Sequence, residues 1–142
     1  MLGGQVMDIL SEGKSVGLET VEFIHLHKTA ALIAGSLVMG AQMANAADST
    51  VKELREFGIK IGLGFQIVDD CLDLEQTTET LGKDAKSDLA KGKATYPSVM
   101  GLDASKNKAR ELIDGAVAQL RALPIDDTVL ESMARYIITR VN

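Results

Sequence analysis

Hydrophobic and polar positions recur along this chain mostly with the helical period of about 3.6 residues, and strand-like alternation is scarce. The segment from Gly3 to Ile9 follows this pattern, and Gly13 interrupts it, which predicts the end of a helix. From Leu18 to about Asn45 the pattern continues without a break. We therefore expect a short helix followed by one long helix in the first third of the chain.

A new helix start is indicated after this long helix. Thr50 followed by Glu53 fits a capping box, in which each side chain accepts a hydrogen bond from the other residue's backbone N–H. Asp48-Ser49-Thr50 followed by Glu53 is therefore interpreted as a helix start, and the helix is expected to run from there to about Glu75. Thr77 to about Ala94 is polar and rich in lysine and aspartate, which predicts a loop.

The remaining pattern predicts three further helical pieces. Tyr96–Leu102 is a short apolar segment, and Ser105–Leu123 is amphipathic with leucine and alanine along one face. Pro124 should end that helix, because proline cannot continue it. The last helix is expected from about Asp127 to Thr139.

Length and composition fit this pattern. The chain has 142 residues, of which 46% are hydrophobic and 25% charged, which is typical of one globular domain. We therefore predict an all-α fold, a helical bundle forming a single domain over residues 1–142. The net charge of −5 argues against nucleic-acid binding by phosphate neutralisation. The single cysteine, Cys71, indicates a reducing compartment and is interpreted as a small core residue.

Thr29–Ala47 carries no charge and is long enough to raise the question of a membrane span. Most of it is alanine, glycine, serine and methionine, and Gln42 and Asn45 lie inside it. This composition favours a buried helix of a soluble protein, so no membrane span is predicted. The first residues lack the basic region of a targeting peptide.

The most informative chemistry lies in the middle helix, where Asp69, Asp70 and Asp73 interrupt an apolar run. Asp69 and Asp73 stack one helical turn apart, and Gln66 shares their edge. Buried charge is costly unless a cation neutralises it, and carboxylate oxygens at this spacing suit a hard cation such as Mg2+. The sequence therefore predicts a metal site whose ligands are Asp69, Asp70 and Asp73.

Small and basic residues accompany this acidic edge. Gly58 and Gly62 lie one turn apart near it, which allows another backbone or a ligand to approach closely. Lys28 and Thr29 open the uncharged stretch, although Lys28 taken alone is better explained as a residue at the boundary between helix and surface. His25 and His27 are two residues apart and point to different sides, so they are not a zinc pair.

Further lysines follow the acidic helix in the polar segment, among them Lys83 and Lys93. Taken alone, this segment reads as a solvated charged loop. Lysine is nonetheless a suitable point-charge ligand for phosphate. Carboxylates that bind Mg2+, together with lysines and an amide that bind phosphate oxygens, describe a diphosphate site.

The motifs together resemble those of the trans-type prenyl diphosphate synthases. They are Gly4-Gln5 with Asp8, Lys28-Thr29, Phe-Gln-x-x-Asp-Asp-x-x-Asp at 65–73, and the segment that ends in Gly-Lys-x-Thr-Tyr-Pro at 92–97. The order and spacing match the C-terminal half of that family over essentially the whole chain. The run from Glu22 to Leu32 is most similar to the geranylgeranyl branch.

The resemblance implies an all-helical, usually homodimeric enzyme that joins isopentenyl diphosphate to an allylic diphosphate with the help of Mg2+. It implies catalytic roles for Lys28, Asp69 and Asp73, with the aspartates helping to hold the metal. Residues carried over as contacts to the allylic diphosphate are Lys28, Thr29, Gln66, Lys83 and Lys93. Phe65 would line the isopentenyl site.

One departure from the family pattern leaves alternatives open. Family members carry two aspartate-rich motifs, and only the second is matched here, so we expect a fragment or a truncated product with little or no activity alone. A non-catalytic helical partner, forming a heterodimer with a full-length synthase, is the main alternative. A terpene cyclase is less favoured, because the Gly-Lys-x-Thr-Tyr-Pro segment is typical of chain-elongating enzymes. The expected location is the cytoplasm or the plastid stroma.

Overall fold

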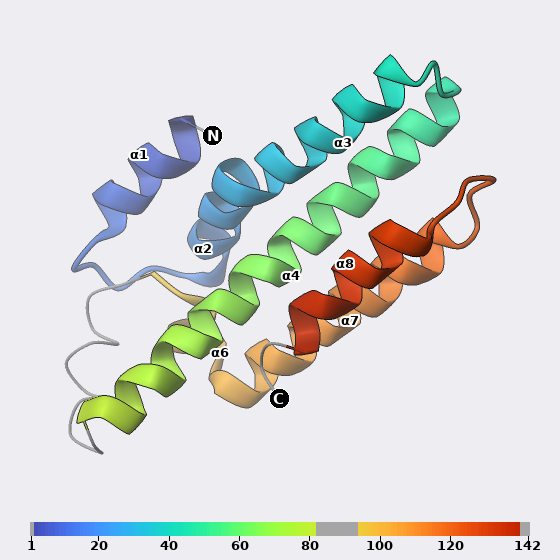
Figure 1. Cartoon of the computed structure of the whole chain (residues 1–142). Helices are drawn as coiled ribbons and strands as arrows, with labels where there is room; N and C mark the ends of the chain where they lie inside the picture. The colour runs from blue at the N-terminus through green and yellow to red at the C-terminus, as the bar shows by residue number, and fades with distance from the viewer. Residues whose placement is uncertain (1, 82–93, 140–142) are drawn as a thin grey trace.

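The computed structural model describes residues 2–81 and 94–139, and for residues 76–81 the backbone alone. All regular elements in these two ranges are helices, which confirms the all-α prediction (Figure 1). Their bounds are α1 Leu2–Ser11, α2 Leu18–His25, the π-helix η1 Leu26–Ala30, α3 Ala31–Met43, α4 Asp48–Leu81, α6 Tyr96–Met100, α7 Leu102–Leu120 and α8 Thr128–Thr139.

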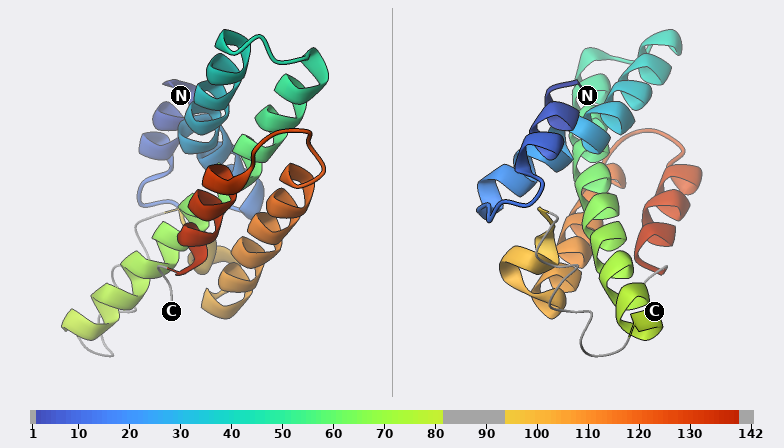
Figure 2. Two further views of the ribbon diagram at one scale, coloured as in Figure 1. Left: turned by 45° about the vertical axis from the view of Figure 1, so that its right-hand side comes forward. Right: turned by 90° about the vertical axis from the view of Figure 1, so that its left-hand side faces the viewer.

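The long helix α4 runs through the middle of the molecule. On one side it packs against η1 and α3, with α1 lying on η1 (Figure 1). On the other side it packs against α7, with α8 beside both (Figure 2). Side chains on α4 therefore face one of two different helical layers, according to their position around the helix.

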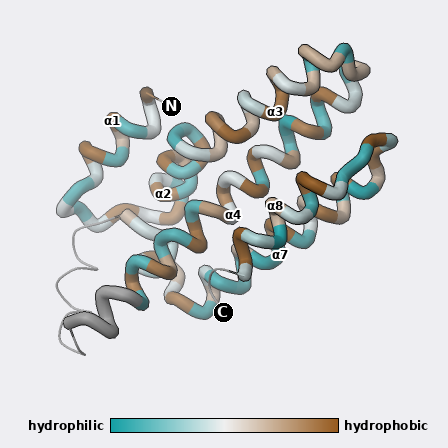
Figure 3. Tube along the Cα trace, viewed as in Figure 1, coloured by the Kyte–Doolittle hydropathy of each residue, from teal (hydrophilic) through white to brown (hydrophobic). Residues whose placement is uncertain are grey.

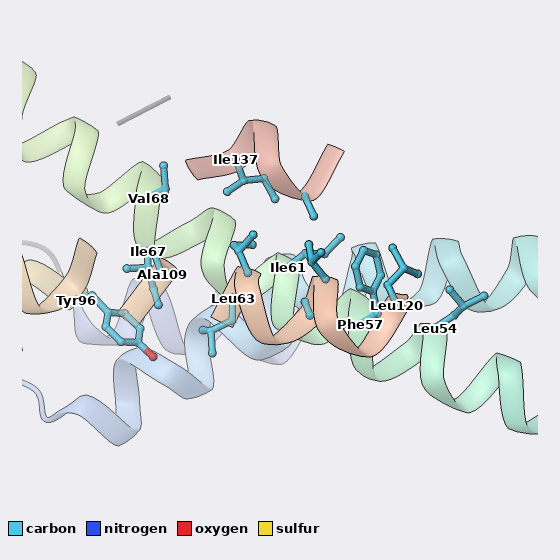
Figure 4. Packing of buried hydrophobic residues seen from close by; sticks show 14 of the residues in the cluster. Leu54, Phe57, Ile61, Leu63, Ile67, Val68, Tyr96, Ala109, Leu120 and Ile137 are labelled. Atoms are coloured by element: carbon cyan, nitrogen blue, oxygen red, sulfur yellow. The ribbon is translucent and has the colours of Figure 1, made fainter. Parts of the chain in front are cut away.

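The apolar core lies mainly between α4 and α7, with α8 closing it (Figure 4). Phe57 and Ile67 of α4, and Ile113 and Leu120 of α7, are completely buried. Burying a side chain of this size stabilises the folded state by about 1.5–3 kcal/mol relative to leaving it in water. The amphipathic pattern that predicted α7 and α8 appears as alternating polar and apolar positions along their traces (Figure 3).

The helix start expected at Asp48-Ser49-Thr50 is present, but the expected capping role of Thr50 is wrong. The helix begins at Asp48, and the Val51 N–H already donates to the carbonyl of Ala47 at 3.0 Å. Thr50 is buried within the first turn rather than capping it. An aspartate in the first turn is favourable there, because it faces the positive end of the helix dipole.

Glu53, expected in the capping box, takes part in a bridge between α4 and α7 instead. Its Oε2 accepts a hydrogen bond from Nε2 of Gln119 at 2.6 Å. Lys60, two turns further along α4, donates to Oε1 of the same amide at 2.6 Å. The Gln119 side chain thus lies between a carboxylate and an ammonium group. At its other end α4 continues past Glu75 to Leu81, so the predicted loop begins too early; residues 82–93 lie outside the described ranges.

The long helix expected from Leu18 to Asn45 is present, but it is not uniform. α2, η1 and α3 follow one another without a break, and η1 is a π-helical turn over Leu26–Ala30. Single π-turns within α-helices occur frequently at functional sites. The helix ends at Met43, and Asn45 adopts a positive φ of 53° just beyond it.

Glycines allow α4 to approach η1 and α3 closely, and α1 to approach η1. A Cβ on Gly62 of α4 would lie 2.5 Å from the Ala30 Cα, and one on Gly58 would lie 2.6 Å from the Ala34 Cα. A Cβ on Gly4 of α1 would lie 2.6 Å from the His27 carbonyl carbon. The predicted close approach at Gly58 and Gly62 is therefore confirmed, and its partner is a protein backbone.

The helical stretch Leu18–Met43 is long and apolar enough, by length and composition, to cross a membrane, and 22% of its most apolar window is buried in the structure. Its inner face packs on α4, whereas Leu32, Met39 and Met43 are exposed. The prediction of a buried helix therefore holds for one face only.

Candidate functional site

The predicted diphosphate ligands Thr29 and Gln66 lie together where η1 meets α4. The Thr29 hydroxyl donates a hydrogen bond to Oε1 of Gln66 at 2.9 Å. The Gln66 Nε2 points in turn toward Oδ1 of Asp70 at 3.5 Å, one turn further along α4. This chain of contacts fixes the orientation of the Gln66 amide between the two helices.

Asp70 differs from the other two predicted metal ligands because its carboxylate points into the protein. Its side chain is buried, and Oδ2 accepts a hydrogen bond from the backbone N–H of Tyr96 at 3.1 Å. The same oxygen lies 3.3 Å from Nε2 of His25, which is also buried. Helices α2, α4 and α6 therefore converge on this one carboxylate, whose metal-binding role stays a prediction.

Asp69 and Asp73 occupy a more open part of the same edge. Asp69 is half-buried and Asp73 is exposed, one turn apart on α4. Among the described side chains, no group of three or more histidine, cysteine or acidic residues is arranged to hold a metal ion. Two carboxylates one helical turn apart, one of them exposed, nevertheless fit part of the shell of Mg2+, which keeps several waters and takes its other ligands from substrate oxygens.

Lys28 is anchored to α1. Its Nζ lies 2.7 Å from Oδ2 of Asp8, and both side chains are partly exposed. An exposed ion pair of this kind contributes only about 0–1 kcal/mol to stability. A phosphate group could therefore compete for the Lys28 ammonium at little cost. Asp8 was part of the recognised motif, but its pairing with Lys28 follows only from the packing of α1 on η1.

Of the remaining predicted site residues, the structure describes Phe65 but not Lys83 and Lys93. Phe65 is half-buried on α4 and packs against the core, so its proposed place in an isopentenyl site stays a prediction. Lys83 and Lys93 lie outside the described residues.

Sequence reasoning missed the polar cluster around Tyr96. The Tyr96 hydroxyl donates to Oε1 of Glu22 at 2.9 Å, and its ring stacks on that of His25 with centroids 5.3 Å apart. Burial, followed by the hydrogen bond to Glu22, raises the pKa of Tyr96 well above its ordinary value, so the hydroxyl stays protonated. A histidine and a glutamate inside an apolar helix were the only signal in the sequence.

His27 behaves differently from His25. It is exposed, its Nδ1 lies 2.9 Å from the Phe23 carbonyl oxygen, and its ring stacks on Phe23 at 4.0 Å. The two histidines therefore lie on different sides of the helix, as the sequence predicted.

Cys71 lies next to the acidic edge but belongs to the core. It is completely buried, and burial followed by the negative charge of Asp70 raises the pKa of its thiol to about 11. A thiol that stays protonated at neutral pH is a poor nucleophile. Cys71 is a core residue, as predicted.

The fold and this edge define a class of all-α proteins in which a long central helix presents carboxylates and an amide beside a lysine–threonine turn. The chain belongs to the polyprenyl synthetase family, because the sequence model of that family matches residues 1–126.

Relatives and solved structures support this assignment. The chain is 46% identical over its whole length to a chloroplastic geranylgeranyl pyrophosphate synthase of Catharanthus roseus, of which it covers 40%. It is also 46% identical to the large subunit 1 of a heterodimeric chloroplastic geranylgeranyl pyrophosphate synthase of Arabidopsis thaliana, of which it covers 39%. A mitochondrial Arabidopsis relative, geranylgeranyl pyrophosphate synthase 10, is 44% identical over the whole chain, which covers 43% of it.

Among solved structures, a geranyltransferase from Helicobacter pylori complexed with magnesium and isoprenyl diphosphate matches with a TM-score of 0.75 and 33% identity. The match covers 99% of this chain and 46% of that one. The chain thus spans about two fifths of the length of the curated relatives it matches. Its expected correspondence to their C-terminal half stays a prediction.

Proposed function

We propose that this chain forms the part of a prenyltransferase that binds Mg2+ and an allylic diphosphate, in an enzyme that condenses the diphosphate with isopentenyl diphosphate. The single observation that carries the proposal is the hydrogen bond between Thr29 and Gln66, because it joins the Lys28–Thr29 turn to the acidic edge of α4. Thr29 and Gln66, which lie 37 positions apart in the sequence, are thereby placed together to contact one diphosphate.

The names of the relatives support a product of the geranylgeranyl type, and their chloroplastic or mitochondrial names support a plastid or another soluble, reducing compartment. The Helicobacter pylori geranyltransferase, whose match covers this chain almost completely, binds magnesium and an isoprenyl diphosphate. We infer the same class of ligand here.

Each residue has a physical role in this proposal. Asp69 and Asp73 hold Mg2+, which when bound supplies positive charge to the oxygens of the diphosphate. Lys28, Thr29 and Gln66 orient the same oxygens. Lys83 and Lys93 are proposed as further cations, and Phe65 as part of the isopentenyl site.

The chemistry needs this concentration of positive charge. When the allylic carbon–oxygen bond breaks, the electron pair leaves with pyrophosphate, and an allylic cation remains until isopentenyl diphosphate attacks it and loses a proton. Charge prearranged at the departing group lowers the barrier, and the effect is strongest where water is excluded.

Titration calorimetry with inorganic pyrophosphate tests the binding function on this chain itself. We expect binding that requires Mg2+ and falls about a hundredfold or more in Asp69→Ala, because one of the two proposed metal ligands is removed. Asp103→Ala, at an exposed aspartate in the first turn of α7, is the matched control and should bind normally. Binding that is independent of Mg2+, or equal in Asp69→Ala, contradicts the proposal.

The enzyme assay separates binding from turnover. With geranyl diphosphate, isopentenyl diphosphate and Mg2+, we expect the isolated chain to release little or no pyrophosphate, because it spans about two fifths of its relatives. Rapid release would contradict the expectation that other parts of the enzyme are required.

A second function, that of a helical partner for a full-length synthase, is favoured by two facts: the short span and a relative named as the large subunit of a heterodimer. Co-purification with a full-length geranylgeranyl pyrophosphate synthase, together with an altered product, would favour this alternative. Self-association alone would favour the homodimer.

A further inference from the structure

Two polar rungs connect α2 and η1 to α4. The first is the hydrogen bond from Thr29 to Gln66, and the second is the contact between His25 and Asp70. His25 and Thr29 are four residues apart, and so are Gln66 and Asp70, so the rungs follow one another along both helices. Lys28 lies between them in the sequence, and its backbone position is therefore fixed from both ends of the π-turn.

The His25 rung is the more deeply buried of the two. The exposed fractions are 3% for His25 and 8% for Asp70, and the imidazole ring stacks on the buried ring of Tyr96. The His25 Nδ1 has no hydrogen-bond partner among the described residues, so the polar contact of the ring is made through Nε2. A carboxylate accepts hydrogen bonds, so the contact requires the proton on Nε2.

The Asp70 carboxylate links the buried His25 to Gln66, a proposed diphosphate ligand. With Oδ2 held by His25 and by the Tyr96 N–H, Oδ1 faces the Nε2 of Gln66. The Gln66 amide then has only one favourable orientation, with its nitrogen toward Asp70 and its oxygen toward Thr29. The orientation of the Gln66 amide, a proposed diphosphate ligand, thus depends on a buried histidine that is not itself among the proposed ligands.

The same contacts disfavour direct metal binding by Asp70. A metal ion on Oδ2 would have to displace the His25 imidazole and the Tyr96 N–H, leaving two buried donors unpaired. Unpaired buried donors carry the full cost of their lost solvation. Asp69 and Asp73 lie on the more open part of the edge, where Asp69 is half-buried and Asp73 is exposed.

We propose that His25 and Asp70 form a positioning pair, which holds the Gln66 amide and the Thr29 hydroxyl in the orientation that receives the diphosphate. The inference rests on the proposed function, because the oriented groups are its diphosphate ligands. It assigns Asp70 a role different from that of the metal-binding aspartates beside it.

Replacement of the histidine tests the pair, with Mg2+ and inorganic pyrophosphate as the probe. His25→Phe keeps a ring to stack on Tyr96 and removes the Nε2 donor, so we expect affinity to fall about tenfold while cooperative unfolding is retained. His25→Gln restores an N–H near the Nε2 position, and its affinity should return to within about threefold of the unaltered chain. The control is His27→Phe, which keeps the stack on Phe23 at an exposed site and should bind normally.

Replacement of the aspartates distinguishes positioning from metal binding. Asp69→Asn should bind Mg2+ more weakly, so part of its loss should be recovered at high Mg2+. Asp70→Asn should lose about tenfold in pyrophosphate affinity, and saturating Mg2+ should not recover it. Recovery of Asp70→Asn at high Mg2+ would make Asp70 a metal ligand and would overturn the proposal, as would normal binding by this variant.

The outcomes separate this inference from the function on which it rests. If the unaltered chain does not bind pyrophosphate with Mg2+, the proposed function fails and the positioning role fails with it. If Asp69→Ala loses binding while folded His25→Phe binds normally, only the positioning role is overturned. If His25→Phe does not fold, the Asp70→Asn result decides.

Discussion

The two sides of α4 are built on different physical principles. Toward α7 and α8 the interface is mainly apolar and close-packed, with Phe57, Ile113 and Leu120 fully buried, and the Gln119 bridge is a polar contact across it. Toward η1 it consists of glycine contacts and polar rungs, such as those of Gly62 and Gln66. One helix therefore divides a region that supplies stability from a region that arranges polar groups.

This difference has a consequence for substitutions. Apolar burial is proportional to area and tolerant of small angular errors, whereas hydrogen bonds weaken steeply when their geometry changes. Changes on the α7 side should mainly alter the free energy of unfolding. Changes on the η1 side should alter ligand binding as well.

The largest effect on stability is expected from Ile113→Ala, at a completely buried position of α7. Truncating a buried isoleucine removes transfer free energy and leaves a cavity, at a cost of about 2–5 kcal/mol. Urea unfolding measures this cost. Leu112→Ala, at a partly buried neighbour on the same helix, is the control and should cost less. Equal losses at the two positions would remove the distinction between the apolar side and its edge.

Gly62→Ala tests the η1 side. The added methyl group would lie 2.5 Å from the Ala30 Cα, so the helices must separate, with an expected cost of about 1–3 kcal/mol. Because η1 would shift relative to Gln66, pyrophosphate affinity should fall too. The matched control is Gly35→Ala, where a Cβ meets no atom within 4 Å and helix propensity should stabilise the protein by about 0.5–1 kcal/mol. A stable Gly62→Ala variant with normal affinity would show that the close approach is dispensable.

A smaller effect is expected where Arg121, directly after α7, and Arg135 of α8 pair with Glu131. These contacts, at 2.6–2.8 Å, lower the pKa of Glu131 from 4.5 to about 2. Between about pH 4.5 and 2 the Glu131 carboxylate therefore stays ionised in the folded state, whereas it takes up a proton in the unfolded chain. Its contribution to the free energy of unfolding is full above about pH 4.5 and is lost as the pH falls toward 2. Glu131→Gln should flatten this part of the stability profile. An unchanged profile would show that the ion pairs contribute nothing measurable.

The smallest effect is expected at Cys71. Since the pKa of its buried thiol is raised to about 11, iodoacetamide at pH 8 should leave the folded chain unmodified and label it in denaturant. Mass spectrometry measures the labelling. Modification of the folded chain would mean that α4 opens readily next to the acidic edge. It would weaken the contrast between the close-packed side of α4 and the side that arranges polar groups.

The elements that the sequence predicted best are those with a strong apolar period. α7 and α8 are both present because burial of one face decides their existence and their orientation. The bounds of α8 agree to within one residue, whereas α7 lies three residues earlier than expected at each end and stops at Leu120, before Pro124. The capping box of Thr50 and Glu53 was a wrong prediction, because Thr50 is buried and Glu53 bridges to Gln119, which are tertiary effects. The periodicity of hydrophobic residues did not predict the π-turn over Leu26–Ala30.

The candidate site was predictable in the same partial way. The aspartates and Gln66 are recognisable because they interrupt an apolar helix. The contact of Asp70 with His25 and with the Tyr96 N–H joins three segments far apart in the sequence, and no local spacing encodes it. Equal-looking carboxylates at 69 and 70 therefore acquire different surroundings only through the fold.

The Gln119 bridge shows how a neutral group can select one alignment of two helices. Its amide dipole lies with the negative end on Lys60 and the positive end on Glu53. If α7 slipped by one turn along α4, Gly115 or Leu123 would face these charges, and neither side chain can mediate between them. Leucine and isoleucine alone would tolerate such a slip far better. A single uncharged side chain thus fixes the register of α7 along α4, and it disfavours shifted registers that apolar contacts alone would tolerate.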